Sequence, residues 1–134
     1  MASGQSNVIA TYTGPAKRDL SSYQYHAVCI DTDGYIDYCD TSAGTKPLGI
    51  LQNKPSAANA EAEVAILGTS LMVVNATSDI SQGALLGSGN DFHGVEVSAD
   101  NAVYLAMALE DATEDGDIIE VLLMGGPRYI SAGA

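Results

Sequence analysis

The feature that most constrains the fold is an internal repeat. The segment Pro47–Gly68 aligns without a gap with Tyr104–Gly125, at an offset of 57 residues. Four aligned positions are identical: Leu48 and Leu105, Glu63 and Glu120, Val64 and Val121, Gly68 and Gly125. Each copy has the pattern of a strand, a turn, a strand and a closing glycine, and the offset extends weaker similarity over most of residues 23–125. Two strand pairs can align this well by chance, but self-similarity at a fixed period favours two similar β-units.

Short runs of β-forming residues recur from Gln24 onward, and turn-forming residues separate them. The expected strands are Tyr25–Ile30, Tyr35–Cys39, Pro47–Gln52, Glu63–Leu67, Ser70–Asn75, Ala84–Leu86, Gly94–Ser98, Val103–Leu109 and Ile118–Met124. This spacing predicts an all-β body, a compact barrel or sandwich. The run 101–111 is rich in Ala, Leu and Met, which also suit a helix. Its repeat mate contains Pro47 and Gly49, two poor helix formers, so we expect a strand.

The first 22 residues differ from the rest in composition and show no sustained periodicity. We expect residues 1–22 to form an extended N-terminal arm and residues 23–134 to form the β-rich body. Residues 1–18 contain Lys17 and Arg18 and no acid. Since the net charge of the chain is −12, the remaining residues carry −14.

The acidic body excludes some classes of partner. It repels phosphate backbones, so we expect no nucleic-acid binding. The longest apolar run, Ala102–Leu109, has eight residues, whereas a membrane helix needs about 20, so we expect no membrane association. Met1–Ala10 lacks the basic start and apolar core of a secretory signal, which predicts synthesis and retention in a cytoplasm.

Two cysteines flank the turn Thr32-Asp33-Gly34. A three-residue loop there would make Cys29 and Cys39 face each other across a hairpin, whereas a two-residue loop would place them on opposite faces. Cysteine prefers protein interiors, so free buried thiols are the favoured interpretation. The spacing does not suit a zinc site.

No enzyme signature is present in the sequence. His26 and His93 belong to different units at non-equivalent positions, so we expect no catalytic residues. Asp31-Thr32-Asp33-Gly34 with Asp37 hints at calcium, but it lacks the spacing and final glutamate of a calcium loop, and a hairpin turn explains it better. We therefore predict a protein without catalysis, metal or cofactor.

Several motifs together resemble a known family. They are Gly49–Pro55, Gly68–Ser70 as a central turn, Ala108–Ala112, Asp115–Asp117 and Ile119–Leu123. Over Gln24–Tyr129 the chain resembles the small capsid cement or decoration proteins of tailed bacteriophages, a group also labelled as a phage domain of unknown function.

The resemblance implies a structural virion protein on the capsid exterior, assembled in the host cytoplasm. Such proteins are often homotrimers that bridge neighbouring major capsid proteins and stabilise the DNA-filled head. For this chain we expect the arm to order on docking. Val8, Ile9 and Tyr12 would enter apolar niches or add to a capsid sheet edge, and Lys17 and Arg18 would face acidic capsid groups.

Two other functions stay open at this point. One is a carbohydrate-binding or host-adhesion β-module, with a site formed by Tyr35, Tyr38 and Tyr104. The other, a small hydrolase that would use His26 or His93, has the least support.

Overall fold

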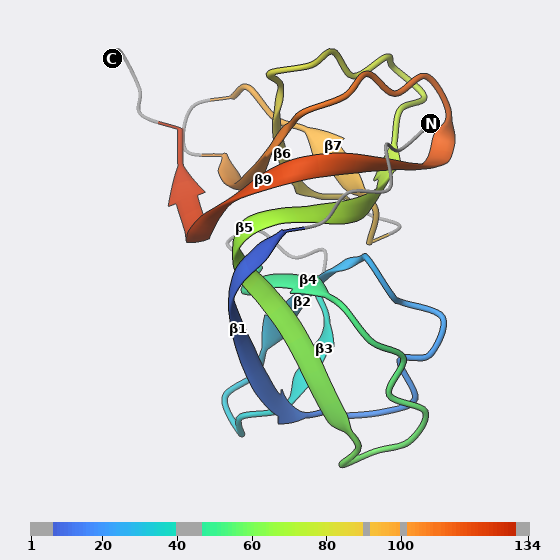
Figure 1. The fold of residues 1–134 in the computed structure, drawn as a ribbon, viewed down its shortest axis with the longest axis vertical. Coiled ribbons are helices and arrows are strands. Elements are labelled where there is room, and N and C mark those ends of the chain that lie inside the picture. Colours follow the sequence, from blue (N-terminus) through green and yellow to red (C-terminus); the bar gives the residue numbers. More distant parts are fainter. Residues whose placement is uncertain (1–6, 40–46, 90–91, 100–101, 131–134) are drawn as a thin grey trace.

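A computed structural model describes residues 7–39, 47–89, 92–99 and 102–130. These residues contain strands and loops and no helix, so the predicted all-β class is confirmed (Figure 1). In particular, no helix long and apolar enough to cross a membrane occurs in these ranges. The strands are β1 (Val8–Pro15), β2 (Ala27–Ile30), β3 (Ile36–Tyr38), β4 (Gly49–Leu51), β5 (Glu61–Asn75), β6 (Leu85–Ser88), β7 (Gly94–Glu96), β8 (Val103–Ala108) and β9 (Asp115–Tyr129).

The strands form two rings that share the long strand β5. In the first ring the pairing order is β3-β2-β4-β5-β1. Ala16, the residue after β1, forms a parallel bridge with Ile36 of β3, and this bridge closes the ring. In the second ring the order is β5-β7-β6-β8-β9, and β9 pairs again with β5. Figure 1 shows these rings as two lobes, with β5 running from the lower lobe into the upper one.

The two rings have equivalent strand registers, so the internal repeat is structural. The pairs Val28–Tyr38 of β2–β3 and Leu86–Glu96 of β6–β7 are related by an offset of 58. The same rings contain the pairs Leu51–Val64 of β4–β5 and Ala108–Val121 of β8–β9, related by an offset of 57. The offset therefore changes by one residue between the third and fourth strands of each ring, and the expected gapless alignment is wrong there.

Strand β1 belongs to the first ring, although it lies within the predicted N-terminal arm. It pairs with β5 from Val8 opposite Gly68 to Pro15 opposite Glu61. The equivalent pairing in the second ring is that of β5 with β9. Residues 1–6 of the predicted arm lie outside the described residues.

The expected turn at Gly68–Ser70 is wrong, because β5 continues through it as a single strand. Gly68 has a φ of +105°, and a Cβ there would lie 2.5 Å from the carbonyl oxygen of Asn7. The glycine thus permits a close approach of the chain before β1 while the strand continues.

The alternative of a helix over 101–111 is excluded by β8, which pairs with both β6 and β9. Its side chains Leu105, Ala106 and Ala108 are buried. Apolar residues that suit a helix form a strand here because both neighbours of the strand and the core supply their contacts.

Two apolar clusters fill the molecule. The smaller one lies within the first ring and consists of Ala16, Leu20, Val28, Ile36, Leu51, Ala62 and Val64. The larger one fills the second ring and also includes Ala27, Ile50 and Ala65 of the first. Side chains of the first ring thereby contribute to the core of the second, which packs the two rings together.

The expectation of free thiols is wrong, because Cys29 and Cys39 form a disulfide with a Cα–Cα distance of 5.0 Å. Ile30 pairs with Ile36, so the connection between β2 and β3 is the five-residue segment 31–35. A loop with an odd number of residues places Cys29 and Cys39 on the same face of the hairpin. The sequence is compatible with either loop length, and the observed register is the one that allows a bridge.

Candidate functional site

The apolar residues predicted to dock on a capsid lie on β1. Ile9 is 71% exposed and Tyr12 is 38% exposed, whereas Val8 packs partly against the larger core. On the neighbouring strand β5, Leu67 is 41% exposed and lies opposite Ala10. The structure therefore leaves Ile9 and Tyr12 accessible and uses Val8 for packing.

The two predicted cationic residues form ion pairs within the chain. Lys17 Nζ lies 3.0 Å from Asp31 Oδ2, and Arg18 Nη2 lies 2.9 Å from Asp37 Oδ2. The hydrogen bond to Asp31 raises the pKa of Lys17 above its ordinary value, and the charge of Asp31 adds to this effect. Arg18 also donates to the Tyr38 hydroxyl at 3.1 Å, and its guanidinium lies 4.8 Å from the centre of the Tyr38 ring.

The acidic turn considered for calcium is a hairpin cap. Asp31 Oδ1 accepts the backbone N–H groups of Asp33 and Tyr35, both at 2.9 Å. The bond from Tyr35, together with Lys17, lowers the pKa of Asp31. Among the described residues, no group of three or more His, Cys, Asp or Glu side chains could hold a metal ion.

An aromatic cluster joins the two rings. Phe92 of the second ring lies 4.5 Å from Tyr38 and 5.9 Å from Tyr23 of the first, measured between ring centres. Next to it, the His26 and His93 rings are 5.0 Å apart, and His93 Nδ1 lies 2.7 Å from Asp115 Oδ1. Sequence reasoning missed this cluster because its members come from separate units, and no spacing rule brings them together.

The three tyrosines predicted to bind carbohydrate do not form one platform. Tyr38 belongs to the aromatic cluster, Tyr35 is in the hairpin after Asp31, and Tyr104 lies on β8 opposite Arg128. No ring contact joins any two of them within the described ranges. A glycan site built from these residues stays a prediction.

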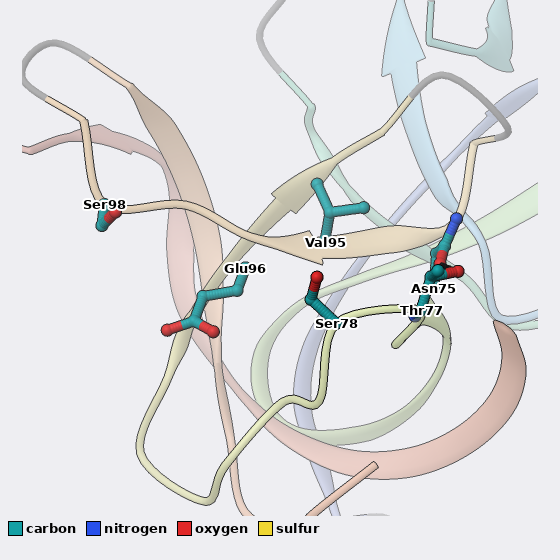
Figure 2. A pocket seen from close by; sticks show the side chains of 6 residues that line it. All are labelled: Asn75, Thr77, Ser78, Val95, Glu96 and Ser98. Atoms are coloured by element: carbon teal, nitrogen blue, oxygen red, sulfur yellow. Dashed lines mark hydrogen bonds between the residues drawn. The ribbon is translucent and has the colours of Figure 1, made fainter. Parts of the chain in front are cut away.

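An open groove of about 400 Å³ lies beside β7 in the second ring. Its lining is mainly polar and consists of Asn75, Thr77, Ser78, Val95, Glu96 and Ser98. Figure 2 shows these side chains coming from the end of β5 and the loop after it, and from the strand β7 and its continuation. On the loop side, Asn75 Oδ1 accepts hydrogen bonds from the backbone N–H and the hydroxyl of Thr77 at 3.0 and 2.7 Å. Such a lining can offer several oxygen acceptors and one carboxylate to a polar group.

Comparison with known proteins finds a similar fold but no related sequence. No family model matches the sequence, and no curated protein matches it. Among solved structures, the fold is similar to that of the N base of the head fiber gp8.5 from bacteriophage phi29. The TM-score is 0.59 at 19% sequence identity, and the match covers 90% of this chain and 98% of that chain. The two chains therefore share a fold over nearly their whole lengths.

Proposed function

We propose that this protein is a structural component of a phage virion. It binds the outer surface of an assembled capsid, bridges neighbouring major capsid proteins and stabilises the DNA-filled head, and it has no catalytic role. The observation that carries this proposal is the fold shared with the base of a phage head fiber. The motifs that resemble capsid cement proteins support the same conclusion independently of that fold.

The β1 strand is the proposed point of contact with the capsid. Among the described residues β5 is the only strand that pairs with β1, and the bridge from Ala16 to Ile36 occupies the other edge only beyond the end of β1. Along residues 8–12 that edge can accept a further strand. Ile9 and Tyr12 are exposed on this strand. An open edge with exposed apolar side chains suits the addition of a capsid strand.

Preference for the assembled lattice would explain how such binding stabilises a capsid, because a ligand stabilises only the state that it prefers. A homotrimer would contact several capsid subunits at once, and later contacts would form at high effective concentration. We propose that this trimer assembles in the host cytoplasm and docks on the capsid exterior.

The test compares two serine substitutions for capsid occupancy. Ile9→Ser removes an apolar group from β1, and Ile30→Ser is the matched control, because Ile30 is 42% exposed on β2, away from β1. A deletion of β1 would remove the β1–β5 pairing, so a loss of binding could then result from a loss of folding.

Purified variants would be mixed with expanded capsids that lack the protein, and bound copies would be counted by sedimentation and in density maps. We expect Ile9→Ser to reduce occupancy and Ile30→Ser to bind like the natural chain. Equal occupancy for both variants would contradict the role of β1, and no binding of the natural chain to capsids would contradict the virion function itself. In that case, glycan binding by the isolated protein would favour the adhesion alternative.

A further inference from the structure

The groove beside β7 has a counterpart in the first ring. The bridges Ala16–Ile36 and Val74–Gly94 are equivalent in the two rings. A few residues later, Leu20 donates its backbone N–H to Pro55 and Ile80 donates to Ala112, at 2.8 and 2.9 Å. The loop 17–19 of the first ring therefore corresponds to the loop 75–79 of the second.

In the first ring, an arginine side chain of this loop covers the third strand. Arg18 bonds to Asp37 and to the hydroxyl of Tyr38, and its guanidinium also contacts the Tyr38 ring. By the strand registers, Asp37 and Tyr38 are equivalent to Val95 and Glu96 of the second ring. In the first ring, an arginine of the same chain thus occupies the surface that is equivalent to the groove of the second ring.

In the second ring, the corresponding loop has no cationic side chain. Its residues 75–79 read NATSD, and the side chains of Asn75, Thr77 and Ser78 line the open groove. Glu96 lies on β7 across from them and is exposed, and it makes no ion pair with any residue that the structure describes. The groove therefore has Val95 in place of the ion-paired Asp37 and a carboxylate, Glu96, in place of Tyr38, and its loop lacks the cation that Arg18 supplies in the first ring.

We propose that this groove binds the guanidinium group of an arginine side chain from a partner protein. Glu96 would accept two parallel hydrogen bonds, which a guanidinium offers and an ammonium does not. The hydroxyl oxygens of Thr77 and Ser78 provide further acceptors, and Val95 provides an apolar contact for the aliphatic stem. The net charge of −12 favours the approach of a cationic partner. The inference stands apart from the virion role, because it concerns a site that any arginine-bearing partner could use.

The test uses the full chain and Nα-acetyl-arginine amide as the probe. Titration of isotope-labelled protein, followed by amide chemical shifts, should give saturable changes at Ser78, Val95 and Glu96. Glu96→Gln should weaken binding about three- to fivefold, the scale of an exposed carboxylate pair. Glu61→Gln is the control, because it removes the same charge from an exposed position on β5 in the first ring, and it should leave the affinity unchanged.

A second variant tests the equivalence of the two rings. Arg18→Ala should uncover the first-ring site, so that the probe also shifts the amides of Asp37 and Tyr38. If Glu96→Gln and Glu61→Gln weakened the affinity for the probe equally, the binding would reflect only the attraction of a cation to an acidic protein, and the proposal would be overturned. The absence of saturable shifts in the groove would overturn it as well. A response to a neutral sugar such as glucose, with none to the arginine probe, would instead assign the groove to carbohydrate.

Discussion

Tyr25 and Gly83 occupy the same position in the two rings and share an unusual backbone conformation. Their φ angles are 66° and 94°, and each donates its N–H at 2.7 Å to the last residue of the ring's fourth strand, Leu51 or Ala108. A non-glycine residue at positive φ is uncommon. The two copies therefore share this conformation, although one has a tyrosine side chain at the position and the other has none.

Three more positions of positive φ recur in the same way. Each has one member in each ring, with the offset of 58 or 57 found for the strand registers: Gly34 and Phe92, Asn59 and Gly116, Gly68 and Gly125. In two of these pairs, one ring has glycine at the position and the other ring has a different residue. The repeat is consequently stronger in the backbone than in the sequence.

The pair of Asn59 and Gly116 predicts how one turn responds to substitution. Gly116 has a φ of +91°, and a Cβ there would have no atom within 4 Å, so only backbone strain opposes a side chain. Gly116→Ala should lower the free energy of unfolding by about 1 kcal/mol. Gly116→Asn should cost less, because asparagine tolerates this conformation and already adopts it at residue 59. Urea denaturation would measure both, and equal costs would refute the explanation.

The disulfide should contribute measurably to stability. The double substitution Cys29→Ser and Cys39→Ser removes a link between residues separated by 10 positions. Loop-closure entropy predicts a loss of about 2–3 kcal/mol in the free energy of unfolding. Thermal or urea unfolding of the oxidised, reduced and double-serine proteins would measure this loss. The reduced protein should behave like the double variant, and identical stability of all three would contradict the prediction.

The carboxylate of Asp31 should make stability depend on pH in the acid range. Its pKa is lowered below the ordinary 3.8, mainly by the N–H of Tyr35 and then by Lys17. The stabilisation is therefore present above the ordinary pKa and is lost as the pH falls through the lowered value. Asp31→Asn keeps an acceptor oxygen but removes the charge, so it should be less stable than the natural chain at pH 7.

This difference should shrink below about pH 4, because the carboxylate is protonated first in the unfolded chain and only at a lower pH in the folded protein. Asp33→Asn is the control, since it removes a charge from the same turn, and its side chain makes no hydrogen bond within the described ranges. Urea unfolding between pH 2 and 7 would compare the three proteins. A stability gap for Asp31→Asn that stays constant over this range would contradict the assignment.

The proposed trimer predicts an effect of charge on the outer face of β9. Ile118 and Leu122 are 40% and 37% exposed there, and they pair with Val73 and Thr69 of β5. We propose that these exposed apolar side chains form the contact surface of the trimer. Leu122→Glu would then introduce a carboxylate without a partner, and the assembly should dissociate. Light scattering coupled to size exclusion would measure the mass in solution.

Ile30→Glu introduces the same charge at a comparably exposed position on β2 and should leave the trimer intact. A natural chain that is monomeric at all concentrations would contradict the proposed trimer. A trimer that survives Leu122→Glu would move the interface away from β9.

The all-β class could be predicted from the sequence, because β-forming runs and turn residues such as Asp33-Gly34 depend only on near neighbours. The two similar units could be predicted as well, because comparing the sequence with itself reveals the repeat. The fourth and fifth strands of each unit were recognisable from matches such as Val64 and Val121, which are buried at equivalent positions.

The partners of these strands became known from the tertiary structure. It placed β1 against β5, made β5 a member of both rings, and brought Phe92 to Tyr38 across the junction. The choice of partner depends on which faces can be buried together between distant parts of the chain, and local pattern does not specify it. Tyr25 and Gly83 are an example: both have a positive φ and donate to equivalent strands, yet a tyrosine and a glycine give no common sequence pattern from which this could be predicted.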